Sequence, residues 1–157
     1  MEEVMDIEFI RENIPFYVEA AFLTARIALT GILFSAGIGF VCCIIRELRI
    51  SVLKQITAAY IELSRNTPLL VQLFVIFYGL PRIGIVFSPF VSAVIGLVIS
   101  EGAYNSEIIR AALQSIPKGQ WEASHALGLK KIQTLTFVIV PQAALIAVPS
   151  LGNMFIS

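Results

Sequence analysis

Four long stretches of the chain carry no charged residue, and they constrain its fold more than any other feature. They cover residues 27–45, 66–81, 83–100 and 132–157. A helix that crosses a membrane needs about 20 mostly apolar residues, because the hydrocarbon core is roughly 30 Å thick. Charged residues make up 14% of this chain, whereas soluble domains contain about 25%. The sequence therefore predicts an all-α, polytopic membrane helical bundle that forms a single domain over residues 1–157.

Polar residues and prolines set the ends of the predicted spans. The second stretch is long enough to cross a membrane only if its helix begins before Asn66. Pro141 and Pro149 interrupt the last stretch, and residues 6–19 are expected to form a short interfacial helix. The predicted spans cover about 18–45, 58–80, 86–109 and 133–150.

Basic residues predict the orientation of these spans, because short cytoplasmic loops are enriched in Lys and Arg. The N-terminal tail has Arg11, and the second loop has Arg82. The first and third loops have four basic residues each: Arg46, Arg49, Lys54 and Arg65, and Arg110, Lys118, Lys130 and Lys131. We expect these two loops to face the cytoplasm and the N-terminus to lie outside.

Small residues recur at helical spacing on the first predicted span. Gly31, Ser35 and Gly39 lie four residues apart and share one face of the helix. Small side chains at this spacing let two membrane helices approach closely. They predict a helix–helix interface, although glycines are frequent in membrane helices in general.

Charged residues near the inner ends of the spans are candidates for function, because burying them in a membrane is costly. Glu62 and Arg65 are three residues apart, and so are Glu107 and Arg110. Residues at this spacing share a helix face and can form ion pairs. We expect pairing within the cytoplasmic half rather than contact with a substrate.

The longest polar stretch covers about residues 110–132 and is predicted to contain a short helix. Pro117 marks a turn before this helix. The helix is expected over about 120–127, ending at Gly128 in the position of a C′ glycine. Trp121 on such a helix could anchor a partner protein. Packing of the helix on its own bundle is the alternative.

The same loop carries a pattern that resembles a known family. Glu122-Ala123-Ser124, then Gly128, and then Val138-Ile139-Val140-Pro141 after nine residues resemble the EAA loop of permease subunits of bacterial ABC importers. Ser124 replaces a second Ala, and Val138 and Val140 replace Ile and Leu. Four further segments resemble the polar amino-acid branch of this family: 65–72, 107–110, 115–120 and 149–156. The resemblance covers about residues 14–157.

The resemblance implies that the loop contains a coupling helix seated in a groove of a separate ATPase subunit. ATP and Mg²⁺ would then bind the partner ATPase. No cofactor is expected on this chain, because it lacks a phosphate-binding loop of the Gly-x-x-x-x-Gly-Lys type. The chain is accordingly expected not to be an enzyme, with neither catalytic nor metal-binding residues. The coupling positions implied by residue match and position in the loop are Gly119, Gln120, Trp121, Glu122, Ala123, Ser124, Ala126, Leu127 and Gly128.

The resemblance further implies a multi-pass subunit of the bacterial plasma (inner) membrane that takes up an amino acid. It would pair with itself or a homologous permease, with two ATPase subunits inside and a solute-binding protein outside. Such permeases have five spans, so a final span is expected beyond the four visible here. A non-transporting membrane scaffold or an inactive truncated permease fragment is the alternative. No residue in the spans is a clear counter-charge for a substrate, so a polar or cystine-like amino acid is expected.

A proline near the start of the second span marks the predicted substrate path. Pro68 frees the backbone carbonyl of Ser64, and such irregular backbone is tolerated where it lines protein or a watery cavity. Gln72 offers a donor and an acceptor toward mid-membrane. A simple structural kink would account for the same residues. The predicted path residues are Thr67, Pro68, Leu70, Gln72 and, as a second wall, Asn153.

Overall fold

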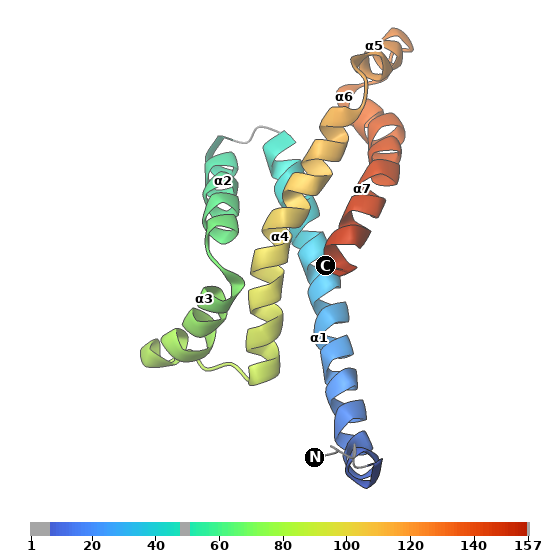
Figure 1. Cartoon of the computed structure of the whole chain (residues 1–157). Helices are drawn as coiled ribbons and strands as arrows, with labels where there is room; N and C mark the ends of the chain where they lie inside the picture. Colours follow the sequence, from blue (N-terminus) through green and yellow to red (C-terminus); the bar gives the residue numbers. More distant parts are fainter. Residues whose placement is uncertain (1–6, 48–50, 157) are drawn as a thin grey trace.

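The computed structural model describes residues 7–47 and 51–156, and within these ranges all regular structure is helical. Figure 1 shows the helices arranged as an elongated bundle. Arg49, one of the basic residues of the first predicted loop, lies outside the described residues. In chain order the helices are α1 (Ile7–Glu47), α2 (Ser51–Asn66), α3 (Leu69–Phe74), a π-helix (Val75–Gly79), a 3₁₀-helix (Leu80–Ile83), α4 (Pro89–Ser115), α5 (Lys118–Ala126), α6 (Lys131–Thr134), a second π-helix (Leu135–Ile139) and α7 (Val140–Ile156).

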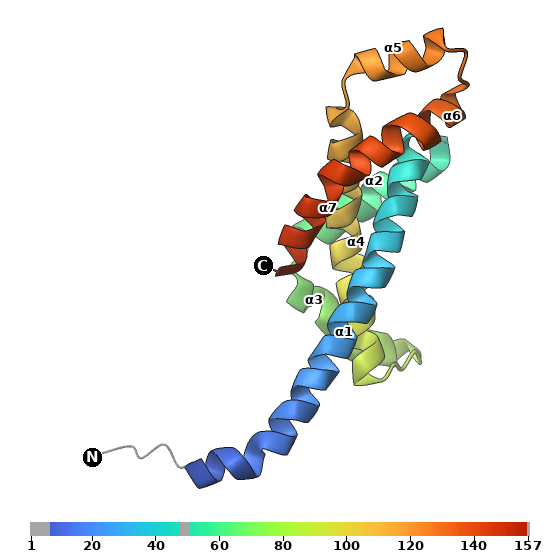
Figure 2. The ribbon, with the colours of Figure 1, turned by 90° about the vertical axis from the view of Figure 1, so that its right-hand side faces the viewer.

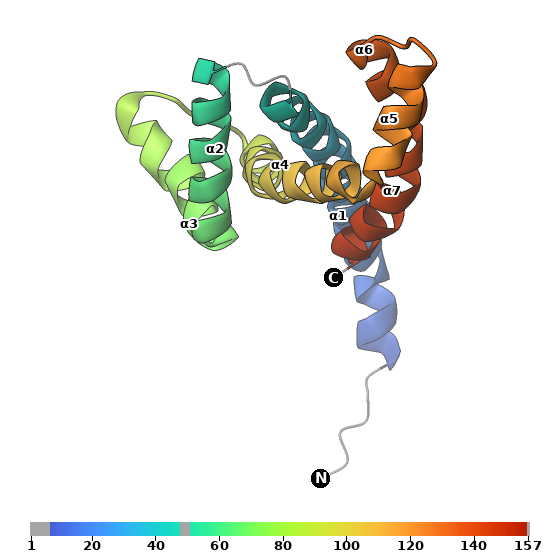
Figure 3. The same cartoon turned by 90° about the horizontal axis from the view of Figure 1, so that it is seen from above.

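Helices α1 and α4 pack along each other and form the centre of the bundle. Helix α7 lies against α4 on one side, whereas α2 and α3 lie on the other (Figures 1 and 3). The end of α1, the start of α2, the end of α4, α5 and α6 are found at one end of the molecule, opposite the start of α1 (Figure 1). The two basic loops therefore share one end, as the predicted orientation requires.

The predicted small-residue face of the first span is an interface with α4. A methyl group added at Gly39 would lie 2.6 Å from the Cβ of Asn105 and 2.9 Å from the backbone nitrogen of Ser106. One added at Gly31 would lie 3.4 Å from Leu97. Close backbone approach of this kind is how membrane helices gain packing energy without a hydrophobic driving force.

A hydrogen bond between buried polar side chains also joins α1 to α4. Asn105 Nδ2 donates to Ser35 Oγ at 3.1 Å, and both residues are fully buried. Further polar residues of α4, Ser92, Ser100 and Ser106, are buried as well. Helix α4 therefore buries these polar side chains against protein rather than exposing them to lipid, although Ser92 Oγ, Ser106 Oγ and Asn105 Oδ1 have no hydrogen-bond partner among the described residues.

Two helical stretches are long and apolar enough to cross a membrane by length and composition, Ile10–Glu47 and Lys131–Met154. Helix α4, with 27 residues, has the length to cross, about 40 Å at the usual helical rise. Large apolar side chains on α1 point away from the bundle: Phe22, Leu29 and Leu33 are 66%, 68% and 71% exposed. So much exposed apolar surface is unfavourable in water and suits a lipid environment.

The structure corrects two boundaries of the predicted spans. Residues 7–19 are not a separate interfacial helix, because α1 continues from Ile7 to Glu47 with Pro15 inside it. The predicted span over 58–80 is not one helix, because α2 ends at Asn66 and α3 begins at Leu69. Pro68 lies in this gap with extended backbone, at φ −54° and ψ 139°, and has no amide hydrogen to continue the helix.

The prolines of the last span do not divide it as the sequence suggested. Pro149 lies inside α7, and Pro141 is its second residue, directly after the π-helix Leu135–Ile139. In that π-helix the hydrogen bonds reach one residue further than in an α-helix. The shift of hydrogen bonding before Pro141 lets the chain continue as a helix despite the missing amide hydrogen.

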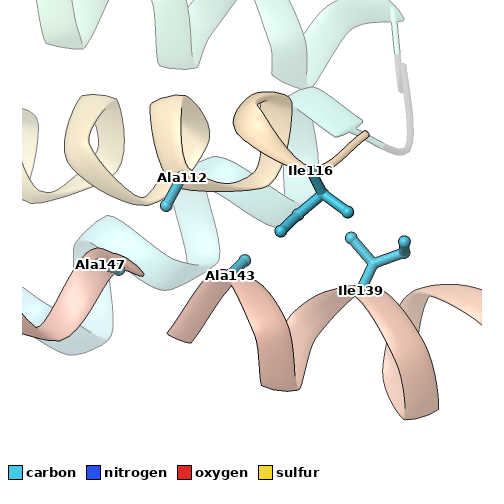
Figure 4. Packing of buried hydrophobic residues seen from close by; sticks show 5 residues of the cluster. All are labelled: Ala112, Ile116, Ile139, Ala143 and Ala147. Carbon is cyan, nitrogen blue, oxygen red and sulfur yellow. The ribbon is translucent and has the colours of Figure 1, made fainter. Parts of the chain in front are cut away.

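A compact apolar cluster fixes α7 to α4. Ile116 at the end of α4 faces Ile139, and three alanines lie beside this pair between the two helices (Figure 4). Ile139 belongs to the Val-Ile-Val-Pro part of the pattern found in the sequence and is fully buried. The cluster consists of Ala112, Ile116, Ile139, Ala143 and Ala147.

Candidate functional site

Helix α5 lies outside the bundle, between the end of α4 and the start of α6 (Figure 2). It covers Lys118–Ala126 and follows Pro117, which has extended backbone. Pro117 ends the preceding helix because a proline disfavours helical backbone in the residue before it. The predicted short helix is therefore confirmed, although it begins two residues earlier than expected.

Gly128 ends α5 in the predicted manner. Its φ is +78°, a conformation in which a side chain would be strained. Its amide donates to the carbonyl of His125 at 2.9 Å, and the amide of Leu129 donates to the carbonyl of Ser124 at 3.1 Å. These two bonds form a Schellman motif, which satisfies the last carbonyl groups of the helix.

One face of α5 is attached to the protein's own bundle. Trp121 packs against the cluster around Ile139, and Ser124 is only 3% exposed. Gln142 Nε2 of α7 donates to Gln120 Oε1 at 3.3 Å. Trp121 and Ser124 thus contact the protein's own bundle, which is the alternative that the sequence left open for this helix.

The opposite face of α5 is open to contact. Glu122, Ala123 and Ala126 are exposed, and Leu127, directly after the helix, is 81% exposed. Gly119 has no neighbouring atom within 4 Å of the place where a side chain would begin. The outward face of α5 is therefore accessible in the described structure.

The residues of the predicted substrate path are not all brought together. Thr67, Pro68, Leu70 and Gln72 lie at the break between α2 and α3. Asn153 is exposed on α7, on the other side of α4 (Figures 1 and 3). Within the described chain Asn153 therefore does not form a second wall for the break.

Gln72 has a clear structural role at this break. Its Nε2 donates to the carbonyl of Ser64 at 3.0 Å and to that of Thr67 at 2.9 Å. Its Oε1 is buried and has no hydrogen-bond partner among the described residues. The amide therefore satisfies the carbonyl that Pro68 frees and leaves one acceptor unused.

Charged side chains gather where the ends of α1 and α4 meet. Glu107 Oε2 lies 2.5 Å from Nη2 of Arg110, as the sequence predicts, and Glu107 Oε1 also pairs with Arg46. The contact with Arg46 was missed, because the two residues are far apart in the sequence and no local signal connects them.

The predicted pair of Glu62 and Arg65 does not form in the described structure. The Arg65 guanidinium instead lies 5.3 Å from the ring centre of Tyr104 on α4. An arginine over an aromatic ring is attracted by the negative face of the ring. Arg65 therefore links α2 to α4 rather than to its neighbour on the same helix.

The chain is similar to proteins of known type over most of its length. The family described as "Binding-protein-dependent transport system inner membrane component" matches residues 31–157. The L-cystine transport system permease protein TcyB of Bacillus subtilis is 39% identical over 91% of this chain and 61% of its own length. The probable amino-acid ABC transporter permease protein PatM of Vibrio harveyi is 40% identical over 96% of this chain and 69% of its own.

A solved structure shares the fold. The crystal structure of an amino acid ABC transporter with histidines matches with a TM-score of 0.89 and 33% identity. The match covers 96% of this chain and 71% of the other. The chain thus spans about three fifths to seven tenths of the length of these proteins.

Proposed function

This chain belongs to the family of inner membrane components of binding-protein-dependent transport systems, and we propose that it forms part of the membrane path through which an ABC importer takes up an amino acid. Its exposed apolar helices support a place in the membrane. The two relatives described above are named as permeases for L-cystine and for amino acids. A polar amino acid is therefore the proposed substrate class.

We propose that α5 is the coupling helix. ATP and Mg²⁺ bind a separate ATPase subunit, and α5 sits in a groove of that subunit. The contact surface consists of the outward residues Glu122, Ala123, Ala126 and Leu127, which are exposed. Trp121 and the Gln120–Gln142 hydrogen bond attach α5 to α4 and α7. Movement of the ATPase is thereby passed through the cluster around Ile139 to the membrane helices.

The proposed assembly contains two permease subunits, identical or homologous, two ATPase subunits and an extracytoplasmic solute-binding protein. The end of the bundle that carries α5 faces the cytoplasm of a bacterial cell, and the N-terminus lies outside. The excess of Lys and Arg in the two loops at the α5 end supports this orientation.

The break between α2 and α3 is proposed to line the substrate path. Thr67 and Pro68 have irregular backbone, which a membrane helix tolerates only beside protein or water, and Leu70 and Gln72 lie in the first turn of α3 directly after it. Asn153 contributes to this path only if a second subunit or another helix bridges the space between α7 and the break at Pro68.

The observation that carries the proposal is a helix held outside the bundle by one face and exposed on the other. Copurification of the ATPase subunit with an affinity-tagged permease tests it. A Leu127→Asp variant is expected to lose the ATPase. A Val52→Asp variant at the start of α2, where the valine is 68% exposed and lies before the predicted span, serves as the control and keeps it. Equal retention of the ATPase by both variants would show that α5 is not the coupling helix.

A further inference from the structure

A polar cavity of about 490 Å³ lies between α1, α2 and α4. Its volume is within the range of about 300–1,000 Å³ that is typical of small-molecule sites. Charged side chains from all three helices line it, and it borders the last turn of α2 before the break at Pro68. The charged lining residues are Arg46, Glu62, Arg65, Glu107 and Arg110.

Some charged residues of this cavity form ion pairs with one another, and others do not. Arg46 and Arg110 share the single carboxylate of Glu107. Glu62 and Arg65 take part in no ion pair among the described residues. The cavity therefore offers one available carboxylate and one available guanidinium, within a surplus of positive charge.

We propose that this cavity binds the charged head of an α-amino acid, with Arg65 receiving the α-carboxylate and Glu62 the α-ammonium group. The inference rests on the proposed function, and it assigns a site for the substrate within the chain. Glu62 and Arg65 are one helical turn apart on α2, so their Cβ atoms are about 5–6 Å from each other. The ammonium and carboxylate of an α-amino acid are also neighbours, joined through a single carbon atom.

The chemistry of each side chain suits its assigned group. A guanidinium can donate two parallel hydrogen bonds to a carboxylate. The ring of Tyr104 holds Arg65 from the side of α4, which reduces the freedom that the side chain loses on binding. Arg46 and Arg110 add positive potential, which favours a ligand that carries a carboxylate over a simple amine.

Besides its charged residues and Asn66 and Tyr104, the cavity has two apolar lining residues. Ala58 and Ile61 of α2 line it and carry no charge. They offer no charged partner for the side chain of the ligand, so recognition would depend on the head group that all α-amino acids share. The fit of the side chain to the remaining space would set the preference.

Uptake by the assembled transporter in proteoliposomes tests this site. The probe is a radiolabelled mixture of the twenty standard amino acids and L-cystine, with the transporter's binding protein outside and ATP inside. The variants are Arg65→Gln, Arg65→Lys and Glu62→Gln. Lys54→Gln is the matched control, because Lys54 is on α2 but does not line the cavity. Copurification of the ATPase shows that each variant still assembles.

Both Gln variants are expected to raise the KM for uptake about tenfold, the change produced by losing roughly 1.4 kcal/mol of binding free energy. Arg65→Lys keeps the charge without the paired hydrogen bonds and is expected to raise KM less. Lys54→Gln is expected to leave KM unchanged. Unchanged KM in assembled Arg65→Gln and Glu62→Gln transporters would overturn the site, whereas absence of uptake by the unaltered transporter would overturn the proposed function instead.

Discussion

The side-chain amide of Gln72 donates to the backbone carbonyl of Ser64 at 3.0 Å. In a continuous helix that carbonyl would accept from the amide of residue 68, which is a proline and has none. The same nitrogen also donates to the carbonyl of Thr67 at 2.9 Å. One side chain therefore satisfies two backbone groups that the helix break would otherwise leave without partners.

Replacing Gln72 with Leu should destabilise the protein. The substitution keeps a similar size but leaves the carbonyls of Ser64 and Thr67 without their side-chain donor. A buried polar group that loses its partner costs about 1–3 kcal/mol. Thermal unfolding in detergent is expected to occur at a lower temperature. If Gln72→Leu unfolds like the unaltered protein but fails to transport, Gln72 acts on the substrate rather than on the break.

Gly39→Ala should separate α1 from α4. The added methyl group would lie 2.6 Å from Asn105 Cβ and 2.9 Å from the backbone nitrogen of Ser106, and backbone atoms cannot move aside without shifting a helix. Overpacking of this kind costs about 1–3 kcal/mol, which thermal unfolding would detect. Gly37→Ala is the matched control, because no atom lies within 4 Å of its added methyl group. Equal stability of the two variants would contradict the close packing of α1 on α4.

The sequence predicts well those features that depend on neighbours in the chain. The position of α5 follows from Pro117 and Gly128, which act on the backbone next to them. The ion pair of Glu107 and Arg110 follows from a spacing of three residues. The face formed by Gly31, Ser35 and Gly39 was also predicted, but the sequence did not identify α4 as its partner.

The features that the sequence missed depend on contacts between distant segments. The pairing of Arg46 with Glu107 joins two helices, and the stacking of Arg65 on Tyr104 displaces the expected pair with Glu62. The sequence left two environments open for Trp121, a partner protein or the chain's own bundle, because a short helix with mixed small and polar residues has no clear apolar face. Only the cluster around Ile139 determines which side of α5 is covered.

Glu107→Gln should destabilise the protein more than Arg46→Gln. Glu107 pairs with both Arg46 and Arg110, so its neutralisation weakens two interactions and leaves two arginines with no carboxylate between them. The side chains are 19–34% exposed, so water screens part of this effect. We expect Glu107→Gln to cost about 1–2 kcal/mol and Arg46→Gln about half of that. In thermal unfolding, the double variant should lose less stability than the sum of the losses in the two single variants. Strictly additive losses would show that the two residues are not coupled.

Gly128→Ala should weaken binding of the ATPase through the backbone alone. With φ at +78°, the added methyl group meets no neighbouring atom but strains the left-handed conformation by about 1–2 kcal/mol. The strain opposes the Schellman motif, so the end of α5 and the exposed Leu127 beside it lose their fixed position. Gly84→Ala is the matched control, since Gly84 has φ at +86° and equally open surroundings but follows the 3₁₀-helix Leu80–Ile83 instead of α5. Both variants are expected to lower the unfolding temperature, whereas only Gly128→Ala should reduce ATPase copurification. Equal loss of the ATPase in both would attribute the effect to general destabilisation, and full retention in both would show that Gly128 does not position the coupling surface.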